Sequence, residues 1–279
     1  MLKNKTLKIV IVVNILLFLA IIIKVNVSKY IEIKRVEDFP KMQEIQGDTW
    51  YKDTNIVGHA GGHIDRYVYT NSKEAVLHTL EQGINVIEID FDYTSDGHLV
   101  CYHLPYNIND GITEMISFKD FMKQKIQGTY TPITPENVFE YMRENPEFYV
   151  AVDTKHESLT EVVKDLVKIC PDKQLLNRLI IQCYYPGEKI KILNVYNFPE
   201  ENIVYTSYKH TDNPYKVIEL CINENYHVAL MDYRDLNEKT IKLFKDKNIY
   251  LYVFTVNDAK KADKLFEQGI HGLYTDFLY

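Results

Sequence analysis

Several features that mark common protein classes are scarce or missing in this sequence. The 279 residues include 39 acidic and 32 basic side chains, for a formal charge of -7. There is no basic surplus to pair with a phosphate backbone, so nucleic acid is not an expected partner. The four cysteines (Cys101, Cys170, Cys183 and Cys221) lack the spacing of a metal site. Two disulfides remain an alternative, but apolar surroundings favour free buried thiols.

One long run near the N-terminus has almost no polar side chains. Residues 7–23 read LKIVIVVNILLFLAIII, and a bilayer core needs about 17–20 apolar residues. The alternative is a buried helix of a soluble domain, but the run has no polar face, which argues against it. The residues that follow it, beginning with Lys24-Val25-Asn26, offer no small-residue cleavage site for a signal peptidase. We therefore expect residues 1–27 to form an uncleaved signal anchor.

The lysines before this run predict its orientation. Lys3 and Lys5 precede it and Lys8 lies at its start, and basic residues remain on the cytoplasmic side of a membrane helix. The sequence thus predicts a single-pass protein of the cell membrane, with a cytoplasmic N-terminus and an extracytoplasmic body. Residues 28–54 are polar with mixed charges and are expected to be a connector. Residues 55–279 are expected to form the folded body.

The body alternates between short apolar runs and segments with helical period. A strand–helix alternation of this kind predicts a (β/α)8 TIM barrel. A doubly wound open sheet is the alternative, but no glycine-rich dinucleotide loop follows the first strand. The eight expected strands are residues 55–58, 86–91, 148–153, 179–184, 203–207, 227–232, 250–255 and 272–275; four of the expected helices are 71–82, 159–169, 236–247 and 259–268.

Chemically active side chains gather where the first predicted strands end. They are His59 after the first strand, Glu88 and Asp90 within the second, His103 at the end of an added short strand (98–103), and Asp153 and Lys155 at the end of the third. An insertion over residues 94–132 breaks the rhythm of the barrel here, on the face where barrel enzymes build their active sites. Three loop tyrosines (Tyr106, Tyr184 and Tyr185) are further candidates for ligand contact.

This set of residues suits phosphoryl chemistry. Strand side chains alternate between faces, so Glu88 and Asp90 point the same way, as do Asp153 and Lys155. Three converging carboxylates repel one another unless a hard divalent cation lies among them. Two histidines beside such a site are suited to general acid and general base catalysis near neutral pH. A lysine and a metal ion can together neutralise phosphate oxygens.

These motifs resemble the glycerophosphodiester phosphodiesterase family, within the wider group of phosphatidylinositol phospholipase C-like barrels. The resemblance extends over residues 56–277 and is most specific in the first half of that range. The matching segments are HAGG at 59–62, TNSKEA at 70–75, IEIDF at 87–91, TSDGHLV at 94–100 with His103, VDTK at 152–155, FTVND at 254–258 and GIHGLYTD at 269–276.

The resemblance implies a role for each candidate residue. His59 and His103 would be the acid–base pair, Lys155 would contact the phosphate, and one divalent cation, Ca²⁺ or Mg²⁺, would be bound by Glu88, Asp90 and Asp153. Three positions depart from the family pattern. Ala60 stands where arginine is common, which removes a bidentate phosphate contact; Asp153 stands where many members have glutamate; and Leu104 follows His103 where aspartate is usual.

The function expected from these observations is hydrolysis of a phosphodiester by a membrane-anchored enzyme. Its substrate would be a glycerophosphodiester, a phospholipid head group or a phosphodiester of a surface polymer. Two alternatives remain. One is phosphoryl transfer or cyclisation by a barrel of the same group, because aspartate two residues before a lysine also resembles sphingomyelinase D. The other is a barrel that binds phosphodiesters without turnover, because the arginine after His59 is missing.

Overall fold

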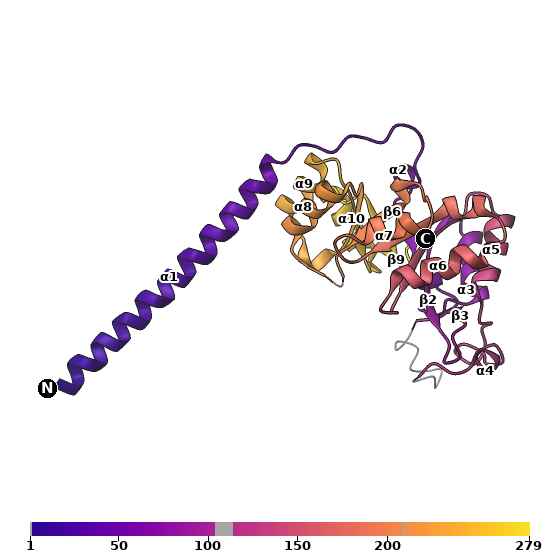
Figure 1. Cartoon of the computed structure of the whole chain (residues 1–279), viewed down its shortest axis with the longest axis horizontal. Helices are drawn as coiled ribbons and strands as arrows, with labels where there is room; N and C mark the ends of the chain where they lie inside the picture. Colours follow the sequence, from indigo (N-terminus) through magenta and orange to yellow (C-terminus); the bar gives the residue numbers. More distant parts are fainter. Residues whose placement is uncertain (1, 104–113, 209) are drawn as a thin grey trace. The chain divides into compact units, whose positions relative to one another are not determined.

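The chain comprises a long N-terminal helix and a separate barrel. The computed structural model describes residues 2–103, 114–208 and 210–279, and the chain divides into two compact units, Met1–Pro40 and Lys41–Tyr279. Helix α1 (Leu2–Asp38) forms most of the first unit (Figure 1). It is continuous because the first proline of the chain is Pro40 and no glycine precedes Gly47. Tyr106, one of the candidate tyrosines, lies outside the described residues.

Helix α1 is long and apolar enough to cross a membrane. The span from Val13 to Asp38 has a window with a mean hydropathy of 1.7, and none of that window is buried inside the protein. The expected apolar N-terminal helix is therefore confirmed. By length and composition a signal sequence has the same properties, so the helix is a candidate for either.

Eight parallel strands form a closed ring in the second unit, as the sequence predicted. Strand β1 pairs with β2 on one side and with β9 on the other, which closes the sheet. The strands are β1 (Ile56–Gly58), β2 (Val86–Tyr93), β4 (Tyr149–Thr154), β5 (Leu179–Cys183), β6 (Ile203–Thr206), β7 (Val228–Asp232), β8 (Tyr250–Phe254) and β9 (Gly272–Thr275). The added strand β3 (Leu99–Cys101) runs antiparallel to the end of β2.

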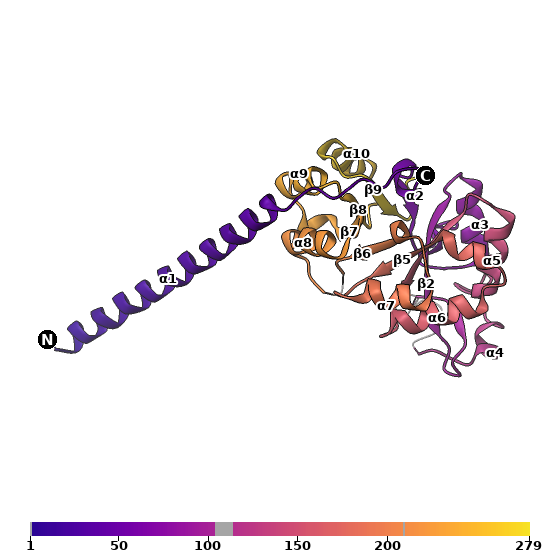
Figure 2. The same cartoon turned by 45° about the horizontal axis from the view of Figure 1, so that its top comes forward.

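Helices surround this ring (Figure 2). They are α3 (Lys73–Glu81), α4 (Phe118–Phe121), α5 (Pro135–Glu144), α6 (Leu159–Ile169), α7 (Glu188–Val195), α8 (Pro214–Glu224), α9 (Glu238–Asp246) and α10 (Ala259–Gln268). Local sequence explains where several of them begin and end. The Ser72 hydroxyl accepts a hydrogen bond from the Ala75 amide at the start of α3, and Gly269 ends α10 in the left-handed conformation. All four cysteines are buried and free, as expected.

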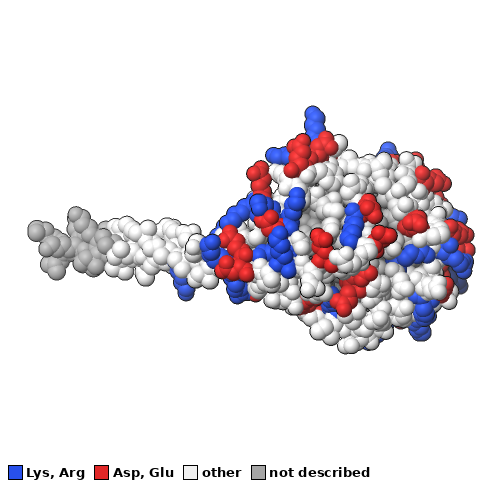
Figure 3. All heavy atoms as spheres, turned by 90° about the horizontal axis from the view of Figure 1, so that it is seen from above, with Lys and Arg blue, Asp and Glu red and all other residues white. Residues whose placement is uncertain are grey.

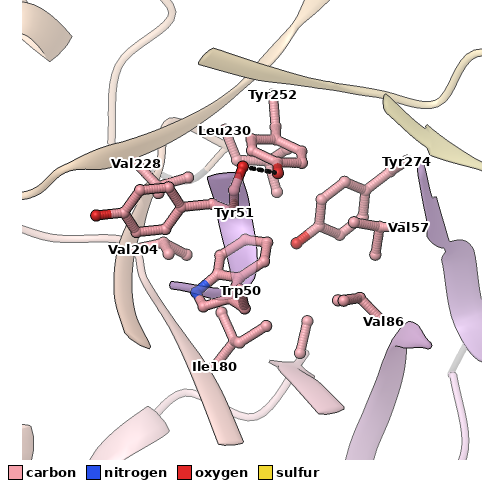
Figure 4. Close-up of a cluster of buried hydrophobic side chains, with 11 residues drawn as sticks. Trp50, Tyr51, Val57, Val86, Ile180, Val204, Val228, Leu230, Tyr252 and Tyr274 are labelled. Atoms are coloured by element: carbon pink, nitrogen blue, oxygen red, sulfur yellow. Dashed lines mark hydrogen bonds between the residues drawn. The ribbon is translucent and has the colours of Figure 1, made fainter. Parts of the chain in front are cut away.

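A short helix closes the N-terminal end of the barrel. Helix α2 (Trp50–Asp53) places Trp50 and Tyr51 in one hydrophobic cluster with residues of all eight barrel strands (Figure 4). The Trp50 indole lies 5.4 Å from the ring of Tyr252, and its Nε1 donates a hydrogen bond to the carbonyl of Glu201 at 3.3 Å. The Tyr252 hydroxyl donates to the carbonyl of Tyr51 at 3.3 Å. We call residues 50–53 the plug.

The segment before the plug also belongs to the barrel unit. The Met42 amide donates to the carbonyl of Lys247 at 3.0 Å, and the side-chain amide of Asn248 donates to the carbonyl of Met42 at 2.9 Å. The later part of the expected connector is thus packed on the barrel. On the face of the body shown in Figure 3, acidic and basic side chains are interspersed.

Candidate functional site

A cavity at the carboxyl ends of the barrel strands brings the six predicted residues together. It has a volume of about 390 Å³. Five of the six line it directly, namely His59, Glu88, His103, Asp153 and Lys155. The sixth, Asp90, lies beside them, with its Oδ1 atom 3.8 Å from both His103 Nε2 and Lys155 Nζ. The register explains the convergence, since Asp90 on β2 is directly opposite Asp153 on β4.

The three carboxylates form one compact acidic group. Glu88, Asp90 and Asp153 are buried, and each offers an oxygen within 4.8 Å of the others. Burial disfavours a charged carboxylate most strongly, and the neighbouring carboxylates add to this effect. The pKa of Glu88 is accordingly raised to about 7, against the opposing effect of His59. The pKa of Asp90 is raised well above its usual range by burial and then by Glu88 and Asp153. Such a group gains stability from a bound cation.

One oxygen of this group lacks a hydrogen-bond partner among the described residues. The Oδ2 atom of Asp90 accepts a hydrogen bond from the side-chain amide of Asn71 at 2.9 Å, whereas its buried Oδ1 has no such partner there. The Asp90 amide in turn donates to Asn71 Oδ1 at 3.0 Å, so Asn71 fixes the orientation of the carboxylate. Buried polar atoms are normally satisfied. A divalent cation with oxygen ligands fits the open Oδ1 and the two adjacent carboxylates.

Lys155 and Tyr184 contact the third carboxylate. The Lys155 ammonium donates to Asp153 Oδ2 at 2.5 Å, and the Tyr184 hydroxyl donates to Asp153 Oδ1. Burial opposes the charge on Lys155, but Asp153 and Asp90 outweigh it and raise the pKa of the ammonium above its usual value. Of the candidate loop tyrosines, Tyr184 therefore reaches the site; Tyr185 is not among the residues that line the cavity.

His59 is oriented by a carboxylate at the end of the last strand. Its Nδ1 lies 2.8 Å from Asp276 Oδ1, and its Nε2 lies 4.0 Å from Glu88 Oε2. Asp276 is itself held by Asn257, whose side-chain amide donates to Oδ2 at 2.6 Å. Burial lowers the pKa of the imidazole, but the bond to Asp276 and the charge of Glu88 outweigh burial and raise it. With Nδ1 as the hydrogen-bond donor to Asp276, Nε2 is the ring nitrogen that faces the acidic group.

His103 has the opposite electrostatic environment. It is buried, and its ring makes an edge contact with Tyr69 at 5.2 Å. Burial, followed by the charge of Lys155, lowers the pKa of His103 to about 4. The ring of Tyr69 also contacts His59, at 4.8 Å. The two imidazoles thus flank the same carboxylates, and at neutral pH His59 favours the protonated form more than His103 does.

The loop after β1 links His59 to the acidic group. Ala60 is buried with φ of 50°, a left-handed conformation that is uncommon for an L-residue. This conformation directs the Ala60 amide at Glu88 Oε2, 2.6 Å away. Where arginine is common in the family, this chain therefore has a small buried side chain, and its backbone amide donates to the Glu88 carboxylate.

The opposite wall of the cavity was not predicted. It includes Asp232, the last residue of β7, and Arg234, which follows the strand, and their side chains form a bidentate ion pair. In the closed ring β7 lies across from β2, because four steps of pairing separate them in either direction. Asn71, Asp276 and this pair were missed as site residues. Asp276 gave the clearest signal, since it directly follows the last strand.

Comparison with known proteins identifies the family. The sequence model of the glycerophosphoryl diester phosphodiesterase family matches residues 59–279 of this chain. The chain belongs to this family. Its members are phosphoric diester hydrolases, and a curated glycerophosphodiester phosphodiesterase of Caldanaerobacter subterraneus is 26% identical over 249 residues, covering 80% of this chain and 94% of the relative. The resemblance inferred from the motifs is thereby confirmed.

Solved structures show that glycerophosphoryl diester phosphodiesterases share this fold. A phosphodiesterase from Oleispira antarctica, solved with the product sn-glycerol-3-phosphate, has a TM-score of 0.64 at 14% identity, covering 82% of this chain and 96% of its own. A glycerophosphodiester phosphodiesterase from Parabacteroides distasonis has a TM-score of 0.61 at 18% identity, covering 80% and 92%. At these identities the similarity establishes the barrel alone.

Proposed function

We propose that this chain hydrolyses a glycerophosphodiester to an alcohol and a glycerol phosphate, with His59 and His103 as its acid–base pair. The observation that carries the proposal is their placement on two sides of one acidic group. His59 Nε2 is 4.0 Å from Glu88, and His103 Nε2 is 3.8 Å from Asp90. An in-line displacement needs a proton acceptor for the attacking water and a donor for the leaving oxygen.

The electrostatics of the two histidines assign these tasks. His103 is held neutral by burial and by Lys155, so it accepts the proton of the attacking water. Asp276 and Glu88 favour protonated His59, which donates to the leaving alcohol oxygen. After one turnover the proton distribution is reversed, and exchange with solvent restores it. Lys155 pairs with a phosphate oxygen while Asp153 keeps its ammonium in place.

Glu88, Asp90 and Asp153 would hold one divalent cation, Ca²⁺ or Mg²⁺, for which the open Oδ1 of Asp90 is the supporting observation. When bound, such an ion polarises the phosphoryl group and neutralises charge as it develops. Asn71 keeps Asp90 aimed at the centre of the group, and Tyr184 and Lys155 do the same for Asp153. These neighbours fix the carboxylates before an ion arrives.

The organisation of the chain supports an enzyme held at a membrane. We propose that residues 1–27 form the signal anchor, that the connector begins at residue 28, and that residues 55–279 form the catalytic body, to which residues 41–54 are packed. By the distribution of basic residues the N-terminus is cytoplasmic and the body extracytoplasmic. The substrate is then a glycerophosphodiester from lipid or from a surface polymer.

Turnover by the full-length protein in detergent tests this function. With Ca²⁺ or Mg²⁺ we expect glycerophosphodiesters to be cleaved, and chelation to abolish cleavage. His59→Ala and His103→Ala should each lower kcat by about 100-fold or more, since general acid–base catalysis contributes about 10²–10⁴-fold. His98→Ala is the matched control, because His98 is exposed and lies outside the cavity residues.

The fate of solvent oxygen tests hydrolysis itself. In H₂¹⁸O, hydrolysis places one labelled oxygen in the phosphate product, whereas transfer to another hydroxyl or cyclisation places none. An unlabelled or cyclic product would refute hydrolysis. Failure of every metal-loaded sample to turn over a phosphodiester that it binds would instead establish a binding protein.

A further inference from the structure

A tyrosine hydroxyl contacts the loop that carries His59. The Oη atom of Tyr279 accepts a hydrogen bond from the His63 amide at 2.9 Å. It also lies 3.2 Å from Thr79 Oγ1, which donates to the carbonyl of Gly61 at 3.2 Å. Because Thr79 gives its proton to Gly61, Tyr279 can give its own proton to Thr79. The Thr79 hydroxyl, on α3, and the Tyr279 hydroxyl, beyond β9, therefore bind Gly61 and His63 of one loop.

The loop backbone rests on these hydroxyls without any intervening side chain. A Cβ atom at Gly62 would lie 1.9 Å from Thr79 Oγ1 and 2.5 Å from Tyr279 Oη, both far inside contact distance. Gly62 also has φ of 84°, in the left-handed region that favours glycine. A glycine is required here because the two hydroxyls occupy the space of a side chain.

The same loop makes the two contacts that define one side of the site. His59 places Nδ1 against Asp276, and Ala60 places its amide against Glu88. Ala60 adopts its left-handed conformation between these contacts, and uncommon backbone conformations persist only where the surroundings enforce them. The Asn71 amide donates to the Ala60 carbonyl at 3.2 Å, and the bonds at Gly61 and His63 add to this enforcement from the far side of the loop.

We propose that Tyr279 is a positioning residue, whose hydroxyl, together with that of Thr79, holds the loop 59–63 so that His59 keeps its bond to Asp276. This inference rests on the proposed catalytic role of His59. Tyr279 is not among the residues that line the cavity, so its hydroxyl acts through the loop. Thr79 is fully buried, and its methyl group packs near Gly58.

Removing each hydroxyl alone in the full-length protein tests the inference. Tyr279→Phe and Thr79→Val should each lower kcat about tenfold, because the lost hydrogen bond lets the loop shift and a small misplacement of a reacting group slows the reaction. KM should change less than twofold. Thr79→Ser keeps the hydroxyl and should retain most of kcat. Tyr196→Phe is the matched control, because it removes a hydroxyl bonded to the Lys173 carbonyl, outside the cavity.

Nitrogen spectra of the histidine rings supply a readout that does not depend on turnover. At a fixed pH at which His59 is neutral, the wild-type ring should show the tautomer protonated at Nδ1, identified by its loss in His59→Gln. Tyr279→Phe should convert this signal to a mixture of tautomers. An unchanged tautomer, or a loss of kcat explained entirely by a lower Tm, would overturn the positioning role. A tautomer change in a protein without phosphodiesterase activity would support it while refuting the proposed function.

Discussion

The plug should stabilise the barrel without taking part in the chemistry. Trp50 is only 7% exposed, and truncating a buried tryptophan to alanine costs about 3–5 kcal/mol. Trp50→Ala also removes the donor to the Glu201 carbonyl, worth about 1 kcal/mol. We expect a total loss near 4 kcal/mol, because the chain partly collapses into the space. At about 2–4 °C for each kcal/mol in a domain of this size, Tm should fall by roughly 8–16 °C.

The assay combines thermal unfolding with turnover in the full-length protein. Circular dichroism gives Tm in the variant, and in the wild type the single tryptophan of the chain reports departure of the plug by a red shift of its emission. Trp50→Phe should recover more than half of the lost stability, since it keeps an aromatic ring against Tyr252. Tyr185→Ala is the control, because that side chain is 43% exposed.

Two results would refute this reasoning. A Tm of Trp50→Ala within 2 °C of wild type, the shift expected for less than about 1 kcal/mol, would mean that the plug is not part of the core. A fall in kcat at temperatures well below Tm would mean that the loss of Trp50 is transmitted to the cavity, for which Leu230 and Tyr274 offer a route, because they share a cluster with the plug and also line the cavity.

Three further predictions concern the site. Asp276→Asn should lower kcat by about 10²–10⁴-fold, as expected when a histidine loses the carboxylate that sets its tautomer. The alkaline limb of the kcat–pH profile should move to lower pH, because the pKa of His59 falls without Asp276; an unmoved limb would contradict the assignment. Asn71→Gly, which tolerates the φ of 43° at this position, should weaken Ca²⁺ or Mg²⁺ binding about 10–100-fold in calorimetry, and unchanged affinity would show that Asn71 does not orient Asp90. In chelator, the Tm should fall as the pH rises from about 4 towards 7, because the folded state holds protons on Glu88 and Asp90 that the unfolded state has released; added Ca²⁺ should remove most of this slope, and a Tm that rises instead would contradict the raised pKa values.

Local patterns were enough to predict the barrel. Each strand is a short apolar run, and β5 is buried at all five positions. Several barrel helices have their own start signal, such as Ser158 before α6, whose hydroxyl accepts a hydrogen bond from the Glu161 amide. The plug could not be predicted in this way. Trp50 and Tyr51 stand in a polar segment without periodicity, and their burial depends on strand ends that are distant in sequence.

The site residues also divide into those that local sequence patterns predicted and those that they did not. Of the six predicted residues, Glu88 and Asp90 alternate with apolar residues inside β2, and the other four lie at or just after the ends of early strands, so the sequence shows each of them as a polar group next to an apolar run. Asp276 and Asn71 act only through partners brought near by closure of the ring. Pairing of β1 with β9 sets Gly58 opposite Thr275, and this register places Asp276 beside His59. The pairing was implied by a barrel, but the hydrogen bond depends on side-chain positions that periodicity does not give.

The charges of the site imply an order of binding. Glu88, Asp90, Asp153 and Asp276 carry four negative charges when ionised, and Lys155 and protonated His59 return two positive ones. Without a cation the cavity is therefore negative and repels a phosphodiester, which is itself an anion. Part of this repulsion is relieved by protonation, as the raised pKa of Glu88 shows, but then a proton occupies a ligand oxygen. A divalent cation held by the three carboxylates would bring the net charge of these groups to zero and would free that oxygen. The substrate should consequently bind after the metal. Removing the metal should therefore weaken substrate binding more than removing the charge of Lys155 does.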